Sequence, residues 1–381
     1  MKRLLVLALA AALAAIAATS AGATRAPYAS SAASAASCAS PTIAIMAPIT
    51  GPVAFLGTEQ RDWAKFSVQE YNRRNGTKFK LIEGDTQLDA AQASTVSQQL
   101  ASNTNVLGVI GPAGSQEVIA SSVNFKKVAM AYVSGSATRT TLTDGSNAGF
   151  FRVVPNDGVQ GPTTARFIRE KLKAKKVFII DDQTAYSIPL ADSVQANLRA
   201  NNIDVSRESV AQSVTDFSAL VSKVSNDTDV VYLPWQVAAN GTLIAQQLKE
   251  QGKSAKIIGS DGLYAPGDFA VEGAHVVAFA PDIRGVPADK AIVAAYNKKY
   301  GTDWGTFGPP TYLAAQVLMI AIRAACLDGK VTRAEVRSQV RKVTINPSIL
   351  GGRFAFTAKG DVVGAKFYIF KITGGKYGLV G

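Results

Sequence analysis

Short apolar segments alternate with longer amphipathic ones along most of the chain. Residues 42–47 are apolar and are followed by a proline, which predicts a buried strand. Residues 57–75 carry large apolar side chains near helical spacing and are followed by Gly76, which predicts a helix and its end. The same alternation predicts strands at 79–82, 106–110 and 128–133, and helices at 90–101 and 116–125.

The alternation starts afresh after Pro155. It predicts strands at 177–180, 203–210, 230–233 and 257–258, helices at 161–172, 188–200 and 241–251, a long helix at 310–327, and a last pair of strands at 353–356 and 365–371. Strands that alternate with helices are typical of a parallel sheet covered by helices on both faces. Two successive blocks of this kind predict an α/β chain with two lobes.

The N-terminal residues have the pattern of a secretory signal peptide. Two basic residues precede an unbroken apolar stretch at 4–18, and a small-residue cleavage site follows at 21–23. Residues 1–23 are therefore predicted to be removed on export, and the Ala/Ser-rich residues 24–40 to form a flexible leader. No later stretch is long and apolar enough to span a bilayer, so we expect an exported protein of the periplasm or cell surface.

Composition and charge fit a globular protein without a nucleic-acid partner. Hydrophobic residues make up 47% and charged residues 18% of the chain, a balance typical of folded rather than disordered proteins. The formal charge of +12 suggests nucleic acid, but the basic residues are spread out without an arginine-rich arm. The densest cluster, Lys171, Lys173, Lys175 and Lys176, lies between a predicted helix and strand and is expected to be a solvated helix end.

Two cysteines, Cys38 and Cys326, bear on the compartment and the anchoring of the chain. Outside the cytoplasm two cysteines usually form a disulfide, which is the bond we expect here. A lipid anchor on Cys38 is the main alternative, and two free thiols are the third. Lipoprotein signals have leucine three residues before the cysteine and an apolar stretch close by, whereas Ala35 stands there and the apolar stretch ends far upstream.

Motifs for catalysis and for metal binding are incomplete in this sequence. Gly252-Lys253-Ser254 resembles the end of a phosphate-binding loop, but Gln247 stands where that loop needs glycine. No nucleophile elbow or cysteine–histidine cluster is present, and His275, the single histidine, lies on an apolar stretch. Asp181 and Asp182 are adjacent in sequence, so in a strand or loop their carboxylates would point away from each other and would not form a catalytic pair. We therefore expect no enzyme, no cofactor and no metal site, with a carboxylate hydrolase as the weaker alternative.

The loops that follow the predicted strands are rich in small and polar residues. They span 48–56, 111–115, 134–138, 181–186, 234–236 and 260–264. In open parallel sheets, ligands bind beyond the carboxyl ends of the strands, where these loops lie. Their glycines, hydroxyls, aromatic residues and few acids suit a small polar ligand held by backbone groups, hydroxyls and one opposite charge.

Four segments of the chain resemble a known family in their order and spacing. They are Thr50–Ala54, Gly111–Ser115, Ser134–Leu142 and Gly259–Gly262. They resemble the leucine/isoleucine/valine-binding proteins, the substrate-binding components of ABC importers for branched-chain amino acids, and the likeness runs from about Thr42 to the C-terminus. It implies two Rossmann-like lobes of the type I periplasmic-binding fold, a ligand in the cleft between them, and a membrane permease as partner.

The resemblance also implies that three segments cross between the lobes. On this sequence the crossings are expected near Pro155, Pro281 and Gly351. Lobe 1 would comprise residues 41–155 with 281–350, and lobe 2 residues 156–280 with 351–381.

Contacts to the ligand's two charged ends are implied in the first lobe. Ser115, which follows Gly114, would bind the carboxylate through its hydroxyl and amide, and its place between a strand and a helix start is one where N–H groups attract anions. Ser136 would offer its carbonyl to the ammonium group, and Thr138 its hydroxyl and amide to the carboxylate. A helix-capping serine and a hydroxyl-rich turn are the structural alternatives.

The second lobe would add an aromatic residue and an acid. The resemblance implies that Tyr186 packs over the ligand and that Asp261 pairs with its ammonium group. A surface tyrosine and an ordinary aspartate–glycine turn are the structural alternatives at these two positions.

Departures from the family pattern concern the side-chain pocket. Leu56, next to Phe55, stands where the family has a tyrosine, and another aromatic position falls at Trp235 or Gln236. The half of the site that holds the amino-acid backbone is retained, so an amino acid with an apolar or aromatic side chain is the expected ligand. Relatives that bind amides, urea or aromatic acids supply one alternative, and a ligand sensor not coupled to transport supplies another.

Overall fold

A five-stranded parallel sheet forms the first half of the structure. The computed structural model describes residues 36–364 and 366–381, and the sheet has the strand order β3-β2-β4-β5-β6. Its strands are β2 (Thr42–Ala47), β3 (Lys80–Asp85), β4 (Val106–Ile110), β5 (Ala131–Ser134) and β6 (Phe150–Arg152). All but β3 consist of buried residues, as expected of a parallel sheet covered on both faces.

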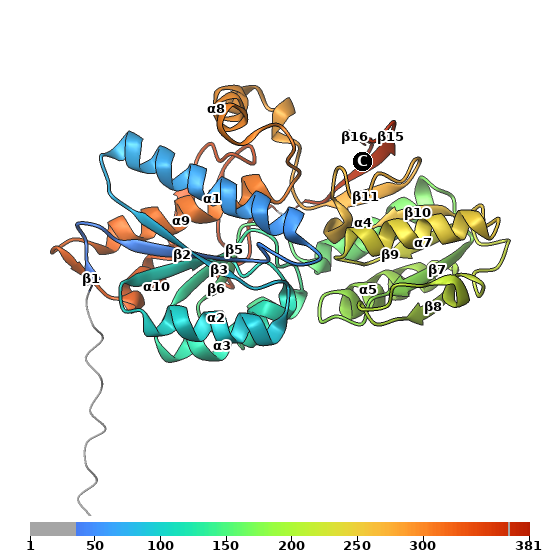
Figure 1. The fold of residues 1–381 in the computed structure, drawn as a ribbon, viewed down its shortest axis with the longest axis horizontal. Coiled ribbons are helices and arrows are strands. Elements are labelled where there is room, and N and C mark those ends of the chain that lie inside the picture. The colour runs from blue at the N-terminus through green and yellow to red at the C-terminus, as the bar shows by residue number, and fades with distance from the viewer. Residues whose placement is uncertain (1–35, 365) are drawn as a thin grey trace, which may run out of the picture. The chain divides into compact units, whose positions relative to one another are not determined.

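Helices lie on both faces of this sheet (Figure 1), and alternate residues of β2 belong to different cores. Ile43 and Ile45 join the core formed with α1 (Ala54–Asn75) and α9 (Gly308–Ala325). Ala44 and Met46 join the core formed with α2 (Ala90–Ser102) and α3 (Ser115–Lys127). The period of two that every strand has therefore accounts for helices on both faces of this sheet.

A seven-stranded sheet forms the second half. Its order is β16-β15-β11-β10-β9-β7-β8, parallel from β11 to β8 and antiparallel at β15 and β16. The strands are β7 (Lys176–Asp181), β8 (Asp204–Ser209), β9 (Val230–Leu233), β10 (Lys256–Gly259), β11 (His275–Ala278), β15 (Tyr368–Thr373) and β16 (Lys376–Leu379). These two helix-covered sheets confirm the predicted α/β fold with two lobes.

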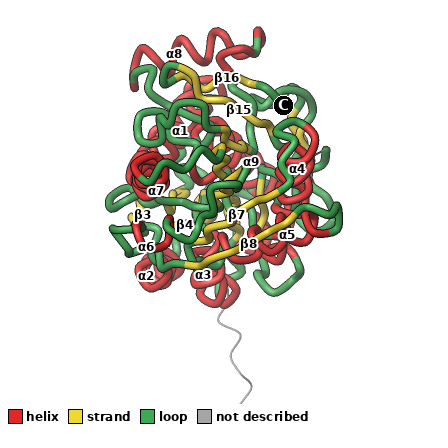
Figure 2. The backbone as a smooth tube through the Cα atoms, turned by 90° about the vertical axis from the view of Figure 1, so that its right-hand side faces the viewer, coloured by secondary structure: helices red, strands yellow, loops and turns green. Residues whose placement is uncertain are grey.

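Helices lie on both sides of the second sheet, as Figure 2 shows around β7 and β8. They are α4 (Asp157–Glu170), α5 (Ser187–Arg199), the short α6 (Ser218–Val221) and α7 (Ala238–Glu250). His275 lies buried in β11 with its ring 5.1 Å from that of Phe167, so the single histidine is a packing residue there.

Smaller elements complete the described chain. They are α8 (Lys290–Tyr300), α10 (Arg333–Val340), the paired strands β1 (Ala36–Ser37) and β12 (Lys330–Val331), the paired strands β13 (Thr344–Ile345) and β14 (Phe354–Ala355), and four 3-10 turns: η1 (Thr140–Thr143), η2 (Asp261–Leu263), η3 (Ile283–Gly285) and η4 (Pro287–Asp289). No described helix has the length and apolar character needed to cross a bilayer.

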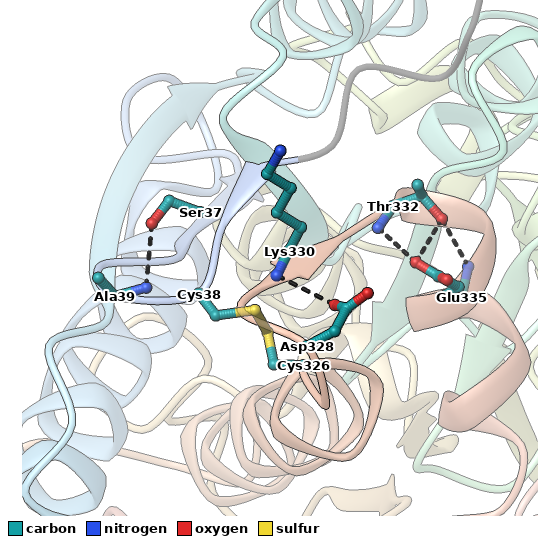
Figure 3. Close-up of a disulfide and its surroundings, with 8 residues drawn as sticks. All are labelled: Ser37, Cys38, Ala39, Cys326, Asp328, Lys330, Thr332 and Glu335. Carbon is teal, nitrogen blue, oxygen red and sulfur yellow. Dashed lines mark hydrogen bonds between the residues drawn. A yellow bond between two sulfur atoms is a disulfide. The ribbon is translucent and has the colours of Figure 1, made fainter.

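A disulfide joins Cys38 to Cys326 beside the β1–β12 pair (Figure 3). The N–H of Cys38 also donates to the carbonyl of Gly329 at 3.2 Å. Residues 36–40 therefore belong to the fold, and the prediction that the flexible leader extends to residue 40 is wrong for these residues. The predicted signal peptide lies outside the described residues.

The two strands observed near the predicted ranges 353–356 and 365–371, β14 and β15, belong to different sheets. Phe354 and Ala355 (β14) pair with β13, because Phe354 and Phe356 pack their rings near Phe151 of the first sheet. The N–H of Arg152 donates to the carbonyl of Gly360 at 3.0 Å, so the chain still lies against the first sheet at Gly360. We therefore propose that the third crossing follows Gly360 rather than Gly351; the other predicted lobe boundaries stay predictions.

Candidate functional site

Two buried carboxyl groups share one amide donor. Asp157 begins α4 and Asp261 begins η2, directly after β10, and each is 3% exposed. The side-chain nitrogen of Gln160, one turn into α4, donates to Asp157 Oδ1 at 2.9 Å and to Asp261 Oδ1 at 2.6 Å. Gln160 therefore holds the two acids close to each other.

Tyr186 completes this cluster from the start of α5. Its hydroxyl donates to Asp261 Oδ1 at 2.6 Å, and the Asp261 N–H donates to the side-chain oxygen of Gln160 at 3.2 Å. Burial raises the pKa of the Tyr186 hydroxyl, so the group remains a donor. The structure thus brings together Tyr186 and Asp261.

The acid pair lacks a basic partner among the described residues. Burial raises the pKa of Asp261, and burial together with the neighbouring Asp261 charge raises the pKa of Asp157. The basic residue whose charge reaches Asp157 is Arg152, and it is paired with Asp361 at 2.6 Å. Buried carboxylates are costly unless they are paired, so this cluster favours a bound cation or a retained proton.

Hydroxyl groups line the adjoining loops of the first sheet. Ser115, 1% exposed, is the first residue of α3, and its oxygen accepts from the Arg139 N–H at 3.3 Å. The N–H of Gly114 donates to Glu117 Oε2 at 2.5 Å, so the Gly114 amide is used within the loop. Ser115 thus combines a buried hydroxyl with the start of a helix.

Ser136 and Thr138 follow β5 on the next loop. The Ser136 hydroxyl donates to the carbonyl of Ala113 at 2.8 Å and accepts from the side chain of Gln60 at 2.9 Å. The Thr138 carbonyl accepts from the Asp157 N–H at 2.9 Å, which joins this loop directly to the acid pair.

Two polar atoms at this junction have no hydrogen-bond partner in the described part of the chain. They are Thr138 Oγ1 and Asp157 Oδ2, both inaccessible to solvent. The Thr138 hydroxyl is nevertheless close enough to Asp157 to lower the pKa of that carboxyl, so the two groups lie next to each other at the junction of the two loops.

The remaining predicted residues separate into different roles. Trp235 is fully buried and donates from its indole nitrogen to the Ile180 carbonyl at 2.7 Å, so it anchors the second sheet's own core. The side-chain oxygen of Gln236 instead accepts from Gln116 of α3 at 3.1 Å. Of the two residues at which the family's aromatic position falls, Gln236 is therefore the one that reaches the first-sheet loops.

An apolar wall lies beside the hydroxyl loops. Phe55 packs its ring edge-on to Phe307, with centroids 6.4 Å apart, and contacts a small cluster of Val53, Leu88 and Val237. Leu56 is buried in the core next to it. Val237 comes from the second half of the fold, so this cluster also joins the two halves.

Sequence analysis missed Asp157, Gln160 and Gln60. The loop after the strand that ends at Arg152 leads straight to Asp157, so the rule about loops after strands could have found this acid. The two glutamines lie within helices and carried no such signal. Among the described residues no group of three or more histidine, cysteine and acidic side chains could hold a metal.

Comparison with known proteins agrees with this arrangement. Residues 40–376 match the periplasmic binding protein family. A Leu/Ile/Val-binding protein of Rhizobium johnstonii is 28% identical over 88% of this chain and 92% of its own length.

Two solved structures extend the comparison. A leucine-binding protein of Thermotoga maritima has a TM-score of 0.82 and 22% identity, over 90% of this chain and 98% of that one. A solute-binding protein of an ABC transporter from R. palustris, in complex with benzoate, has a TM-score of 0.79 and 18% identity, over 90% and 96%. These two likenesses concern the fold.

Proposed function

The chain belongs to the periplasmic binding protein family, and on that premise we propose that it is the extracytoplasmic solute-binding component of an ABC importer. Its ligand is an α-amino acid, bound reversibly between the lobes and released unchanged to a membrane permease. The observation that carries this proposal is the buried acid pair, Asp157 and Asp261, without a basic partner among the described residues and next to the orphan hydroxyl of Thr138.

The acid pair supports recognition of an ammonium group. An ammonium group has three N–H donors, and it can satisfy Asp261 and the open oxygen of Asp157 at once. Charge-assisted hydrogen bonds of this kind are the stronger class. The Ser136 carbonyl remains the third proposed acceptor, and Tyr186 orients Asp261 through its 2.6 Å hydrogen bond.

The opposite end of the ligand would bind the hydroxyl loops. Ser115 offers its hydroxyl and its N–H at the start of α3, where unpaired N–H groups and the helix dipole favour an anion. The Thr138 hydroxyl, buried and unpartnered in the described structure, is the second proposed donor. An amino-acid carboxylate lies next to its ammonium group, as these hydroxyls lie next to the acid pair.

The apolar wall supports an apolar or aromatic side chain on the ligand. Phe55, Leu56 and Leu88 offer carbon surface and no charge. The Rhizobium relative is a Leu/Ile/Val-binding protein, which agrees with that side-chain class. The benzoate complex of the R. palustris protein represents the alternative of an aromatic acid. Such a ligand has no ammonium group and would leave both carboxyl groups unpaired, so we favour the amino acid.

The proposal is tested by removing Asp261. A thermal-shift screen of amino acids, amides and benzoate first identifies the best ligand. Asp261→Ala should then bind that ligand at least about thirtyfold more weakly by calorimetry, because removing one partner of a buried charge pair costs about 2–5 kcal/mol. Asp268→Ala, an exposed aspartate seven residues on, is the matched control and should bind like the wild type.

Two outcomes would contradict the proposal. One is an Asp261→Ala variant that melts normally and binds an amino acid as tightly as the wild type. The other is a screen in which benzoate binds and every amino acid fails.

A further inference from the structure

A cavity of about 800 Å³ opens in the first lobe, and neither Asp157 nor Asp261 lines it. Its walls come from residues 143–151, from α10 with the residues after it, and from residues 358–359. Figure 1 shows α10 against the first sheet, and none of the lining residues belongs to the amino-acid site described above. The cavity therefore needs an explanation of its own.

Four basic side chains line this cavity. They are Arg337, Arg341, Lys342 and Lys359, and the single acid beside them is Asp144. Within the described residues, none of the four is in an ion pair. The Asp144 carboxylate accepts instead from the Ser146 N–H at 2.8 Å. The lining thus carries three positive charges in excess.

Sequence spacing sets the two arginines side by side. Arg337 and Arg341 are four residues apart, so they lie on one face of α10 and its C-cap. Lys359 comes from a separate segment, the turn that precedes Asp361, and Lys342 follows Arg341 directly. Basic side chains from two separate segments therefore line one cavity. A run of basic residues along one exposed helix would not surround a ligand in this way.

Small residues between the cations leave the hollow open. Ala148, Gly149, Ala334 and Ala358 all line it. Gly149 has φ of +94°, and a Cβ at this position would lie 2.4 Å from the Met130 carbonyl oxygen and 3.2 Å from Arg337 Cδ. A larger residue at Gly149 would therefore displace the Arg337 stem from the cavity wall.

We propose that this cavity is a second ligand site, which binds a small oxyanion with two or more negative groups. Arginine binds phosphate and carboxylate oxygens through two parallel hydrogen bonds, and two arginines with two lysines match several such groups. The volume lies within the range of small-molecule sites. A single-charged anion would leave most of the cations unneutralised.

The lysine cluster near residue 173 shows the contrast. Lys171 and Lys173 are exposed, as are Arg341, Lys342 and Lys359, but the first two do not line this cavity, and Lys176 pairs with Asp227 at 2.9 Å. These lysines agree with the solvated helix end expected from the sequence. They offer a charge-matched control for the cavity.

The test titrates the full chain with inorganic pyrophosphate and with citrate by calorimetry at low ionic strength. We expect saturable binding of at least one of them with a stoichiometry of one, and much weaker binding of orthophosphate. Arg337→Gln/Arg341→Gln should weaken it at least about tenfold, the loss of about one charge-assisted contact. Lys171→Gln/Lys173→Gln, which removes the same charge elsewhere, should bind within about twofold of the wild type.

The anion that binds identifies the chemical class, phosphate or carboxylate. Non-saturable heats, or an equal loss in both double variants, would overturn the proposal, since net charge alone would then explain the binding. Amino-acid binding and the melting temperature of the arginine variant report whether it is folded. If it is not, Lys342→Gln/Lys359→Gln replaces it in the same comparison.

Discussion

At the residue scale, Asp157 and Asp261 pose an electrostatic problem for the empty site. Both are buried, both accept from one amide, and burial raises the pKa of each. Two carboxyl groups this close do not both ionise at their usual pKa, so the pair titrates as a unit. A proton on the pair is the alternative to a bound ammonium group.

This competition predicts that ligand binding releases a proton. The empty pair has a pKa above the usual carboxyl range, and an ammonium group stabilises the ionised form and lowers that pKa. Protons and ligand therefore exclude each other: affinity falls as the pH drops through the raised pKa, and it is independent of pH above it.

Calorimetry in buffers of different ionisation enthalpy measures the effect. At a pH just below the raised pKa we expect about one proton released per ligand, and less in Asp157→Asn, which removes one of the coupled acids. A binding enthalpy that is the same in all buffers would show that the pair is already ionised and would contradict this account.

Similarity to known loops predicted four residues of this candidate site, and their contact with a ligand stays a prediction. Ser115, Thr138, Tyr186 and Asp261 were named beforehand, and a Tyr186–Asp261 hydrogen bond is present. Gln160 could not be named, because a glutamine inside a helix carries no signal until α4 is packed beside η2. The choice between Trp235 and Gln236 for the family's aromatic position likewise depends on packing, because the Trp235 indole donates to the Ile180 carbonyl.

At the element scale, one arginine organises the loop that carries Thr138. Arg152 ends β6 with its side chain fully buried. It donates to the carbonyls of Ala137 and Arg139, at 3.1 and 2.7 Å, on either side of Thr138. It also donates to Thr143 Oγ1 at 2.9 Å and to Asp361 at 2.6 Å. The loop, the end of β6 and the segment near residue 361 are thereby fixed together.

Arg152→Ala should destabilise the fold and loosen the ligand loop. It removes the cationic partner of Asp361 and the donor to three loop carbonyls, and breaking a buried ion pair costs about 3–5 kcal/mol in the free energy of unfolding. Denaturant unfolding measures that loss, and calorimetry should show weaker amino-acid binding in the folded variant.

A double-mutant cycle separates the stabilisation due to the Arg152–Asp361 ion pair from the stabilisation due to the packing of Arg152. Arg152→Ala/Asp361→Ala should cost less than the sum of the two single changes, because both remove the same interaction. Strict additivity would mean that Arg152 acts independently of Asp361, through its packing and its hydrogen bonds to the loop carbonyls.

Regular elements were predictable, and irregular ones were not. The strands around 42–47 and 230–233 follow from apolar runs, whereas β16 is short and mostly exposed and gave no such signal. Gln87 and Leu88 both have positive φ, at 53° and 61°, which non-glycine residues rarely adopt. Leu88 nevertheless takes its place in the apolar cluster with Val237, so the fold imposes this turn.

At the scale of the whole molecule, three contacts join residues of the two lobes directly. Gln116 donates to Gln236 at 3.1 Å, Arg139 donates to the Ala185 carbonyl at 2.9 Å, and Val237 packs with Val53 and Leu88. Each contact joins a first-sheet loop to a second-sheet loop. They therefore stabilise the arrangement in which the two lobes touch, whatever the ligand is. The site residues then determine which ligand binds.

Removing these contacts should weaken binding without changing specificity. The apparent dissociation constant equals the intrinsic one divided by the fraction of molecules in the competent arrangement. Gln236→Ala/Val237→Ala removes one hydrogen bond and apolar contact, so we expect affinity about fivefold to tenfold lower, mainly through faster dissociation. The factor should be the same for every amino acid that binds, because neither contact is proposed to touch the ligand's charged ends.

Stopped-flow and calorimetric measurements on two ligands of different side-chain size provide the comparison. Gln246→Ala, an exposed glutamine of α7, the helix that follows Val237, is the matched control and should behave like the wild type. Small-angle scattering should show the same radius of gyration for variant and wild type at saturating ligand, since a ligand shifts the population by its preference for one arrangement. A loss confined to the larger ligand would instead make Val237 a pocket residue, and the lobe contacts would then carry no general role in affinity.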